Sequence, residues 1–126
     1  MNPVLDTSAL LAYLHQEPGW DVVHEVIGEN YIGTVNWCEV AQKTGQKGLE
    51  AGRARSLLEE VGITIVPFSQ EHAELAAALW KPTKRHGLSL ADRACLVLAI
   101  ESEATVLTAD KAWGKLDLDI KFQLVR

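Results

Sequence analysis

Apolar and polar positions follow two different spacings along the chain, and each spacing predicts one kind of element. Short runs rich in β-branched residues, of which 63–67 is the clearest, are typical of buried strands. Segments such as 69–81 place apolar residues three and four positions apart, which is typical of a helix with one buried face. Strands are predicted at 2–5, 31–34, 63–67, 105–107 and 120–125. Helices are predicted at 8–15, 20–27, 35–44, 53–61, 69–81 and 89–102, with a helical turn at 110–113.

Strands and helices alternate along the whole chain. This alternation predicts a central parallel sheet with helices on both faces, because parallel strands are joined by crossovers that are usually helices. Two interruptions are expected, a polar, glycine-rich break at 45–52 and a basic loop at 81–87. No change in composition marks a linker, so the prediction is a single α/β domain over residues 1–126.

Composition changes this picture only slightly. The chain has 126 residues, of which 48% are hydrophobic, and this is enough for one ordinary core. No apolar stretch approaches the roughly 20 residues that cross a bilayer. The first residues also lack the basic region of a signal peptide, so a cytoplasmic protein is expected. Cys38 and Cys95 lack the spacing of metal ligands and are predicted to be buried free thiols.

Four acidic residues fall at or near the carboxyl ends of predicted strands, where α/β sheets collect their ligand sites. They are Asp6, Glu39, Asp92 and Asp110. Each also has a structural explanation. The spacings Ser89-x-x-Asp92 and Asn36-x-x-Glu39 fit capping boxes, and Asp6 and Asp110 stand where single caps are expected.

A cluster of these four acids needs a further explanation. Two like charges about 4 Å apart repel by roughly 4 kcal/mol at an effective dielectric constant near 20. Three or four carboxylates are therefore costly together unless protons or cations neutralise them. Ligands that are all oxygen suit Mg²⁺ or Mn²⁺, and such an ion lowers the pKa of a bound water and stabilises a departing oxygen. The sequence thus predicts a site for a divalent metal.

Three segments carry a family pattern. They are Leu-Asp-Thr-Ser-Ala at 5–9, Leu-Ser-Leu-Ala-Asp-Arg-Ala-Cys-Leu at 88–96 and Val-Leu-Thr-Ala-Asp-Lys-Ala-Trp at 106–113. They resemble the signature segments of PIN-domain nucleases, and most closely those of the VapC-type toxins of bacterial toxin–antitoxin pairs. The resemblance covers the chain in order and length, and its last two segments are the most specific.

This resemblance implies an endoribonuclease that depends on Mg²⁺ or Mn²⁺ and leaves a 5′-phosphate and a 3′-hydroxyl. It matches Asp6, Glu39, Asp92 and Asp110 to the acids of the metal site, and Ser8 and Thr108 to the hydroxyl residues that support them. It also implies an RNA substrate, a homodimer and a cognate antitoxin protein that silences the enzyme. Whether Asp117 or Asp119 joins the site is left open, with solvated surface acids favoured.

The net charge of −5 bears on this function, because proteins that bind nucleic acids are usually basic. Contacts with RNA must come from local basic patches or bound cations. Lys84 and Arg85, in the basic loop, are predicted to contact RNA phosphates, with a solvated loop as the alternative. Lys43 either binds the scissile phosphate or forms an i,i+4 pair with Glu39, and the pair is slightly favoured. Arg93 is expected to point away from Asp92, toward another subunit or the antitoxin.

Two other functions are weighed. A phosphatase of the haloacid-dehalogenase kind, with Mg²⁺ and an aspartyl intermediate, usually has a second acid two residues after its nucleophile. In this chain Ser8 stands at that position after Asp6. The other alternative is a non-catalytic PIN scaffold that binds a protein or RNA partner, and the presence of all four acids argues against it.

Overall fold

A parallel sheet of five strands lies at the centre of the protein, in the order β3-β2-β1-β4-β5. The computed structural model describes residues 2–126, so residue 1 of the predicted domain lies outside the described part. The strands are β1 Val4–Leu5, β2 Asn30–Gly33, β3 Ile63–Val66, β4 Val106–Thr108 and β5 Phe122–Leu124. From β1 the chain moves outward to β2 and β3 and then returns to the other side of β1. The order of strands therefore reverses between β1 and β4, where sheets of this kind form a ligand crevice.

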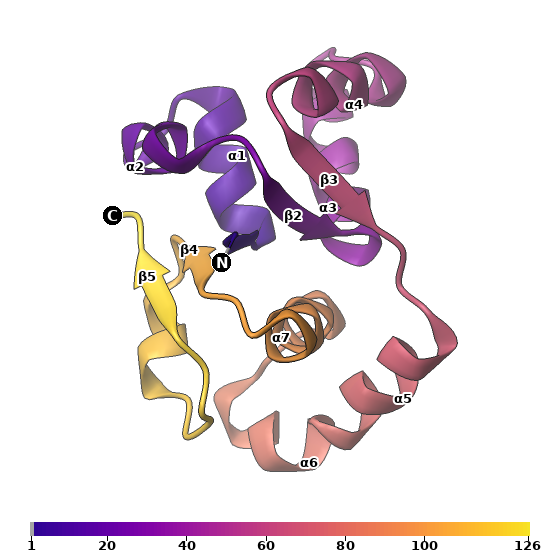
Figure 1. Ribbon diagram of the computed structural model, residues 1–126, viewed down its shortest axis with the longest axis vertical. Helices are drawn as coiled ribbons and strands as arrows, with labels where there is room; N and C mark the ends of the chain where they lie inside the picture. The colour runs from indigo at the N-terminus through magenta and orange to yellow at the C-terminus, as the bar shows by residue number, and fades with distance from the viewer. Residues whose placement is uncertain (1) are drawn as a thin grey trace.

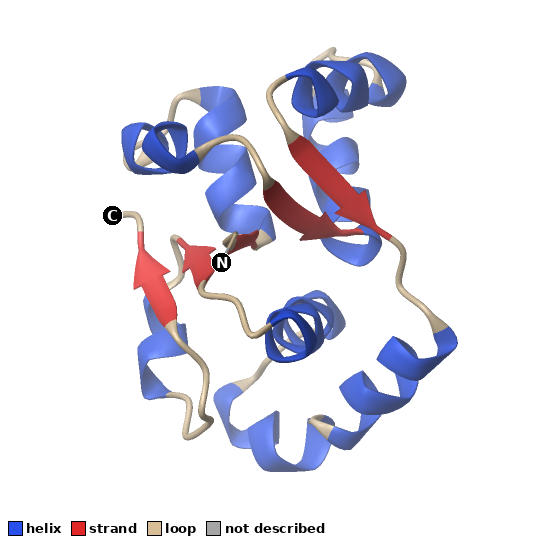
Figure 2. Cartoon of the chain, in the orientation of Figure 1, coloured by secondary structure: helices blue, strands red, loops and turns tan. Residues whose placement is uncertain are grey.

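Helices cover both faces of the sheet, as predicted (Figures 1 and 2). The α-helices are α1 Thr7–His15, α2 Trp20–Val26, α3 Thr34–Gln46, α4 Ala51–Glu60, α5 Gln70–Ala78, α6 Trp80–Thr83 and α7 Leu90–Ser102. Two 3-10 segments, η1 Lys84–His86 and η2 Lys111–Lys115, complete the elements. In Figure 1, α1 to α4 lie above the sheet and α5 to α7 lie below it.

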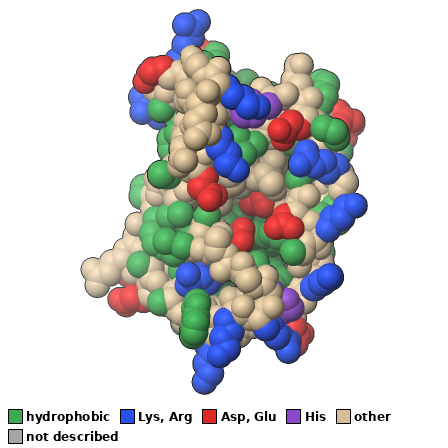
Figure 3. All heavy atoms as spheres, turned by 180° about the vertical axis from the view of Figure 1, so that it is seen from behind, with side chains coloured by type: hydrophobic (Ala, Val, Ile, Leu, Met, Phe, Trp, Pro, Cys, Tyr) green, Lys and Arg blue, Asp and Glu red, His purple; other side chains and the backbone are tan. Residues whose placement is uncertain are grey.

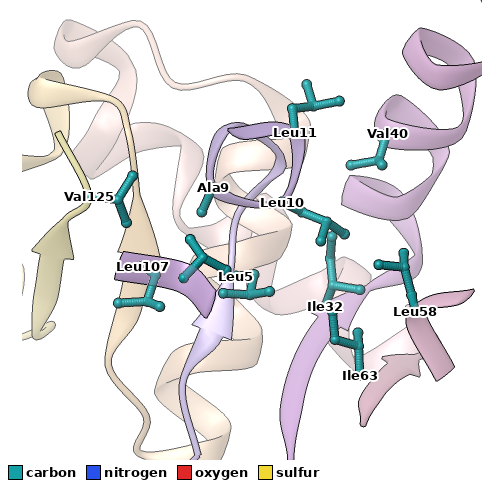
Figure 4. Close-up of a cluster of buried hydrophobic side chains, with 11 residues drawn as sticks. Leu5, Ala9, Leu10, Leu11, Ile32, Val40, Leu58, Ile63, Leu107 and Val125 are labelled. Carbon is teal, nitrogen blue, oxygen red and sulfur yellow. The ribbon is translucent and has the colours of Figure 1, made fainter. Parts of the chain in front are cut away.

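The two faces of the sheet carry separate hydrophobic clusters. Leu5 and Leu107 belong to the cluster under α1, α3 and α4 (Figure 4), whereas Val4 and Val106 belong to the cluster around α7. Val4 pairs with Val106 and Leu5 pairs with Leu107, so the two residues of each pair contribute to the same hydrophobic cluster. Because successive side chains of a strand point to opposite faces, two consecutive apolar residues contribute one side chain to the cluster on each face of the sheet.

The basic segment 81–87 is helical, which corrects the prediction of a loop. The predicted helix 69–81 is two helices, α5 and α6, which meet at Leu79, and η1 follows directly. Pro82 was expected to end the first of them. It instead lies in the first turn of α6, where a missing backbone N–H costs no intrahelical hydrogen bond.

Two further expectations about α3 were wrong. The helix begins at Thr34 with Gly33 as its N-cap, so Asn36 lies inside the helix and does not cap it. Cys38, also in α3, is exposed, whereas Cys95 in α7 is buried as predicted. Burial raises the pKa of the Cys95 thiol well above its usual value.

The last residues of the chain return to the start of α2. Gly19 has a φ of +97°, and a Cβ at this position would lie 2.5 Å from the carbonyl oxygen of Val125. Only glycine therefore permits both the turn and the close approach of the two segments. Arg126 donates from Nη1 to the carbonyl oxygen of Pro18 over 3.1 Å, which brings this cation to the edge of the ligand crevice.

Within residues 2–126, no helix has the length and apolar character that a membrane span requires.

Candidate active site

Asp6 stands at the point where the strand order reverses, directly after β1. It is the N-cap of α1 and is only 4% exposed. Its Oδ1 accepts hydrogen bonds from the backbone N–H of Ala9, over 2.8 Å, and from the Ser8 hydroxyl, over 2.7 Å. Its Oδ2 accepts a hydrogen bond from the Thr108 hydroxyl. A carboxylate has about four acceptor positions, so these three bonds leave room for one further partner.

The hydroxyls of Ser8 and Thr108 connect the end of β4 to this carboxylate. The Ser8 hydroxyl accepts from the backbone N–H of Ala109 over 2.8 Å, and the Thr108 hydroxyl accepts from the backbone N–H of Asp110 over 3.0 Å. Each hydroxyl donates onward to one oxygen of Asp6. The two residues therefore hold the carboxylate in one orientation, which is the supporting position that the resemblance assigned to them.

Burial raises the pKa of Asp6 from 3.8 to about 6. The hydrogen bonds from Thr108, Ala9 and Ser8 lower it in part, and the negative charge of Asp92 raises it further. The ionised carboxylate is therefore held at an energetic cost near neutral pH. A cation beside it would reduce that cost, because it favours the charged form.

Glu39 is oriented by two residues that the sequence did not indicate as part of a site. The Thr7 hydroxyl donates to Oε1 of Glu39 over 2.6 Å. Asn36 is 1% exposed, and its Nδ2 donates to Thr7 Oγ1 over 3.1 Å and to the carbonyl oxygen of Ala91 over 3.2 Å. This chain of bonds joins α3 to the first turns of α1 and α7. The only available signal was that Asn36, read as a cap, also shares a helix face with Glu39.

Asp92 and Asp110 act as local caps, as their spacing predicted. Asp92 forms a capping box with Ser89, with 3.1 Å from its backbone nitrogen to Ser89 Oγ and 3.0 Å from Ser89 N to Asp92 Oδ2. Asp110 accepts from the backbone N–H of Ala112 over 2.9 Å. These bonds hold both acids at helix starts that face the crevice. The structural and functional explanations of these residues are therefore compatible.

All four predicted acids line one open cleft of about 540 Å³ at the carboxyl ends of β1 and β4. Acidic side chains gather near the middle of the face in Figure 3, and basic side chains surround them. Within residues 2–126, no three carboxylate, imidazole or thiolate groups come close enough together to form a complete ion site. The four acids share the cleft but do not form the close cluster of three or four carboxylates that the sequence predicted. One or two carboxylates at a time still fit Mg²⁺, which keeps several of its waters and binds through that number of carboxylates.

The basic residues at the cleft match those singled out in the sequence only at Lys43. Lys43 lines the cleft, and the favoured ion pair with Glu39 is absent from the ion pairs of residues 2–126. His15, Lys47 and Arg126, which the sequence did not indicate, line it as well. The exposed acids Asp117 and Asp119 do not.

Lys84 and Arg85 lie in η1, outside the cleft. The Lys84 ammonium lies 5.5 Å from the centre of the Trp80 ring, a distance typical of a cation–π contact. Their predicted contact with RNA would have to be made beyond the cleft and stays a prediction. Arg93, expected to face a partner, donates from Nη1 to the carbonyl oxygen of Ala76 over 2.9 Å and so joins α7 to α5 in the same chain.

Comparisons with known proteins agree on the fold. Residues 4–118 match the family model of the PIN domain. No curated protein sequence matches. Among solved structures, a toxin–antitoxin complex from Klebsiella pneumoniae is 20% identical, with a TM-score of 0.78 over 99% of this chain and 98% of that one. VapBC-1 from nontypeable Haemophilus influenzae is 16% identical, with a TM-score of 0.73 over 99% and 98%. FitAcB from Neisseria gonorrhoeae is 20% identical, with a TM-score of 0.65 over 97% and 96%.

Proposed function

The chain belongs to the PIN domain family, and on that premise we propose that it is a metal-dependent endoribonuclease and the toxin of a toxin–antitoxin module. One observation carries the proposal. Asp6, Glu39, Asp92 and Asp110 come from four separate segments, yet they line one cleft at the reversal of strand order. Local capping explains where each acid sits in its own segment, but it does not explain why the four share a cleft.

The chain's own residues prepare this cleft for a cation and a phosphodiester. Asp6 is fixed by hydrogen bonds to both of its oxygens, and Glu39 is fixed by Thr7, so neither carboxylate must be ordered when an ion binds. A bound Mg²⁺ or Mn²⁺ would supply an acidified water and stabilise the departing oxygen. Lys43 lies on the cleft wall one helical turn beyond Glu39 and would hold a phosphate oxygen. Preorganised charges of this kind stabilise a transition state without further rearrangement.

The proposal includes the partners that the resemblance implied. One of the similar structures is described as a toxin–antitoxin complex, and two others as VapBC-1 and FitAcB. We propose that this chain likewise binds a cognate antitoxin, and that it forms a homodimer. Large apolar side chains exposed on α5, α6 and α7 offer surface for such contacts, among them Leu75, Trp80 and Leu90.

Removal of the metal tests the proposed reaction. Incubated with total RNA, the protein is expected to cleave in Mg²⁺ or Mn²⁺ and to stop when EDTA is present in excess. The products are separated on a denaturing gel, and a small phosphomonoester is assayed in parallel. Hydrolysis of the phosphomonoester alone would instead support the phosphatase. Bound metal without cleavage would support the scaffold.

Thr7→Val tests the orientation of Glu39. This substitution keeps the shape of the side chain and removes the hydroxyl that donates to Glu39 Oε1. We expect RNA cleavage to fall by about 10- to 100-fold, as for other residues that orient metal ligands through hydrogen bonds. Thr64→Val, on the exposed side of β3, is the matched control and should cleave like the wild type. Equal cleavage by both variants would show that Glu39 needs no such support.

A further inference from the structure

The wall of the cleft beside Glu39 is formed by α1 and α3, which run side by side in the same direction. At the first residue of α1, the Thr7 hydroxyl donates to Glu39, in the middle of α3, over 2.6 Å. At the ends of the two helices, the Lys47 ammonium contacts Nδ1 of His15 over 3.3 Å. On both helices the second contact is eight residues after the first. At a rise of 1.5 Å per residue, the two contacts lie about 12 Å apart.

Charge is distributed unevenly along this wall. Asp6 caps the start of α1 and Glu39 lies in the middle of α3, whereas Lys43 and Lys47 follow Glu39 at intervals of four residues and therefore share its helix face. All four residues line the cleft. Within residues 2–126, neither lysine has a carboxylate at salt-bridge distance. Beside the two lysines, the one acid that lines the cleft, Glu17, is paired with Arg126 over 3.7 Å. The cleft thus has an acidic end, which suits a cation, and a basic end, which suits an anion.

The electrostatics of the helices account for only part of the arrangement at the basic end. Cations are favoured at helix C-termini, and this explains why a lysine and a histidine stand there. It does not explain why the Lys47 ammonium approaches an imidazole nitrogen rather than a carboxylate. Because Lys47 donates to Nδ1, the proton of the neutral ring lies on Nε2. Lys47 and His15 therefore offer two hydrogen-bond donors to a ligand, the Lys47 ammonium and the His15 imidazole N–H.

The ionisation of His15 agrees with this arrangement. Burial lowers the pKa of His15, the positive charge of Lys47 lowers it further, and the negative charge of Glu17 opposes both in part. The imidazole is therefore neutral at neutral pH and accepts the hydrogen bond from Lys47.

We propose that Lys47 and His15 form a second phosphate-binding site, which holds a backbone phosphate of the RNA at a distance from the bond that is cleaved. Taking RNA as the ligand rests on the proposed function. The strand would then cross the cleft along α1 and α3, with one phosphate at the acidic end, the next beside Lys43 and another at Lys47. Lysine binds phosphate as a point charge, and such contacts dominate affinity for nucleic acids.

Lys47→Gln tests this site by binding. The measurement is the affinity of a fluorescein-labelled, single-stranded RNA of mixed sequence in Mg²⁺ over a series of salt concentrations. It is made in protein that also carries Asp92→Asn, so that the RNA is not cleaved. We expect about tenfold weaker binding, the effect of losing one hydrogen bond to a charged group. The slope of log K against log salt should fall by about 0.7, the value for one phosphate of a single strand. Lys47→Arg should restore both the affinity for RNA and the slope of log K against log salt.

Lys121→Gln is the matched control, because this exposed lysine lies at the opposite end of the sheet and loses the same charge. Equal weakening by Lys47→Gln and Lys121→Gln would overturn the second site. Cleavage of total RNA by the wild type in Mn²⁺, run in parallel, tests the proposed function separately. If the wild type cleaves and the two variants bind alike, only the second site fails. If the wild type neither binds nor cleaves RNA, both proposals fail.

Discussion

Replacing Asp92 with asparagine is expected to reduce metal-dependent RNA cleavage by about 10³-fold or more. A catalytic cation supplies several kcal/mol of transition-state stabilisation, and each 1.36 kcal/mol corresponds to a factor of ten in rate. The fold should survive, because an asparagine side-chain oxygen still accepts the hydrogen bond from the backbone of Ser89. The measurement is the initial rate of RNA cleavage in Mg²⁺ and in Mn²⁺.

Asp117→Asn is the matched control, since this acid is exposed and lies outside the cleft. It should cleave at the wild-type rate. The melting temperatures of both variants should stay close to that of the wild type, which separates a lost catalytic group from a lost helix cap. Cleavage by Asp92→Asn within a few-fold of the wild-type rate would remove Asp92 from the active site.

Asp6→Asn, unlike Asp92→Asn, is expected to raise the stability of the folded protein in metal-free buffer. Burial raises the pKa of Asp6 from 3.8 to about 6, which corresponds to about 3 kcal/mol of destabilisation once the group is ionised. Asparagine carries no charge and keeps one oxygen for the backbone of Ala9. We therefore expect a gain of about 2 kcal/mol at pH 8 in EDTA. This is a rise of about 5 to 10 °C in melting temperature for a chain of this size.

The pH dependence of this effect has a definite sign. Between pH 4 and pH 6 the folded protein holds the Asp6 proton more tightly than the unfolded chain does. The contribution of Asp6 to the free energy of unfolding therefore falls as the pH rises through this window, and it stays low above pH 6. The difference between Asp6→Asn and the wild type should be small near pH 4 and complete above pH 6.5.

Urea denaturation in EDTA over this pH range measures the difference, with Asp117→Asn as the control. Added Mg²⁺ should stabilise the wild type and leave Asp6→Asn nearly unchanged, because binding to the folded state alone raises stability. A large loss of stability in Asp6→Asn at pH 8 would show that its role as the cap of α1 outweighs the cost of its charge.

Local patterns in the sequence were sufficient for the class of fold and for four of the acids that line the cleft. The alternation of strands and helices predicted the parallel sheet, which the structure confirms. Asp6 follows β1 directly, and Asp110 follows β4 after one residue. Parallel strands end at the same edge of a sheet, so the positions of these acids in the chain already indicated a shared region.

Predictions from local patterns were wrong where one residue type is compatible with two different local structures. Pro82 suits the first turn of a helix as well as the residues after a helix, and the sequence around it does not distinguish the two. Asn36 matches a capping box with Glu39, but it is buried between α1, α3 and α7, where it bonds Thr7 and Ala91. Its role depends on helices that are distant in the sequence.

What the sequence alone determined is the type of most elements, the burial of most of their faces and the acidic chemistry at the ends of the strands, because these follow from spacing within a few residues. The tertiary structure decided which elements are neighbours. Only the order of the strands brings Thr108 to Asp6, and only the parallel packing of α1 on α3 brings His15 to Lys47. Such contacts depend on how the sheet and the helix layers pack together, and the spacing of residues along the chain does not predict that packing.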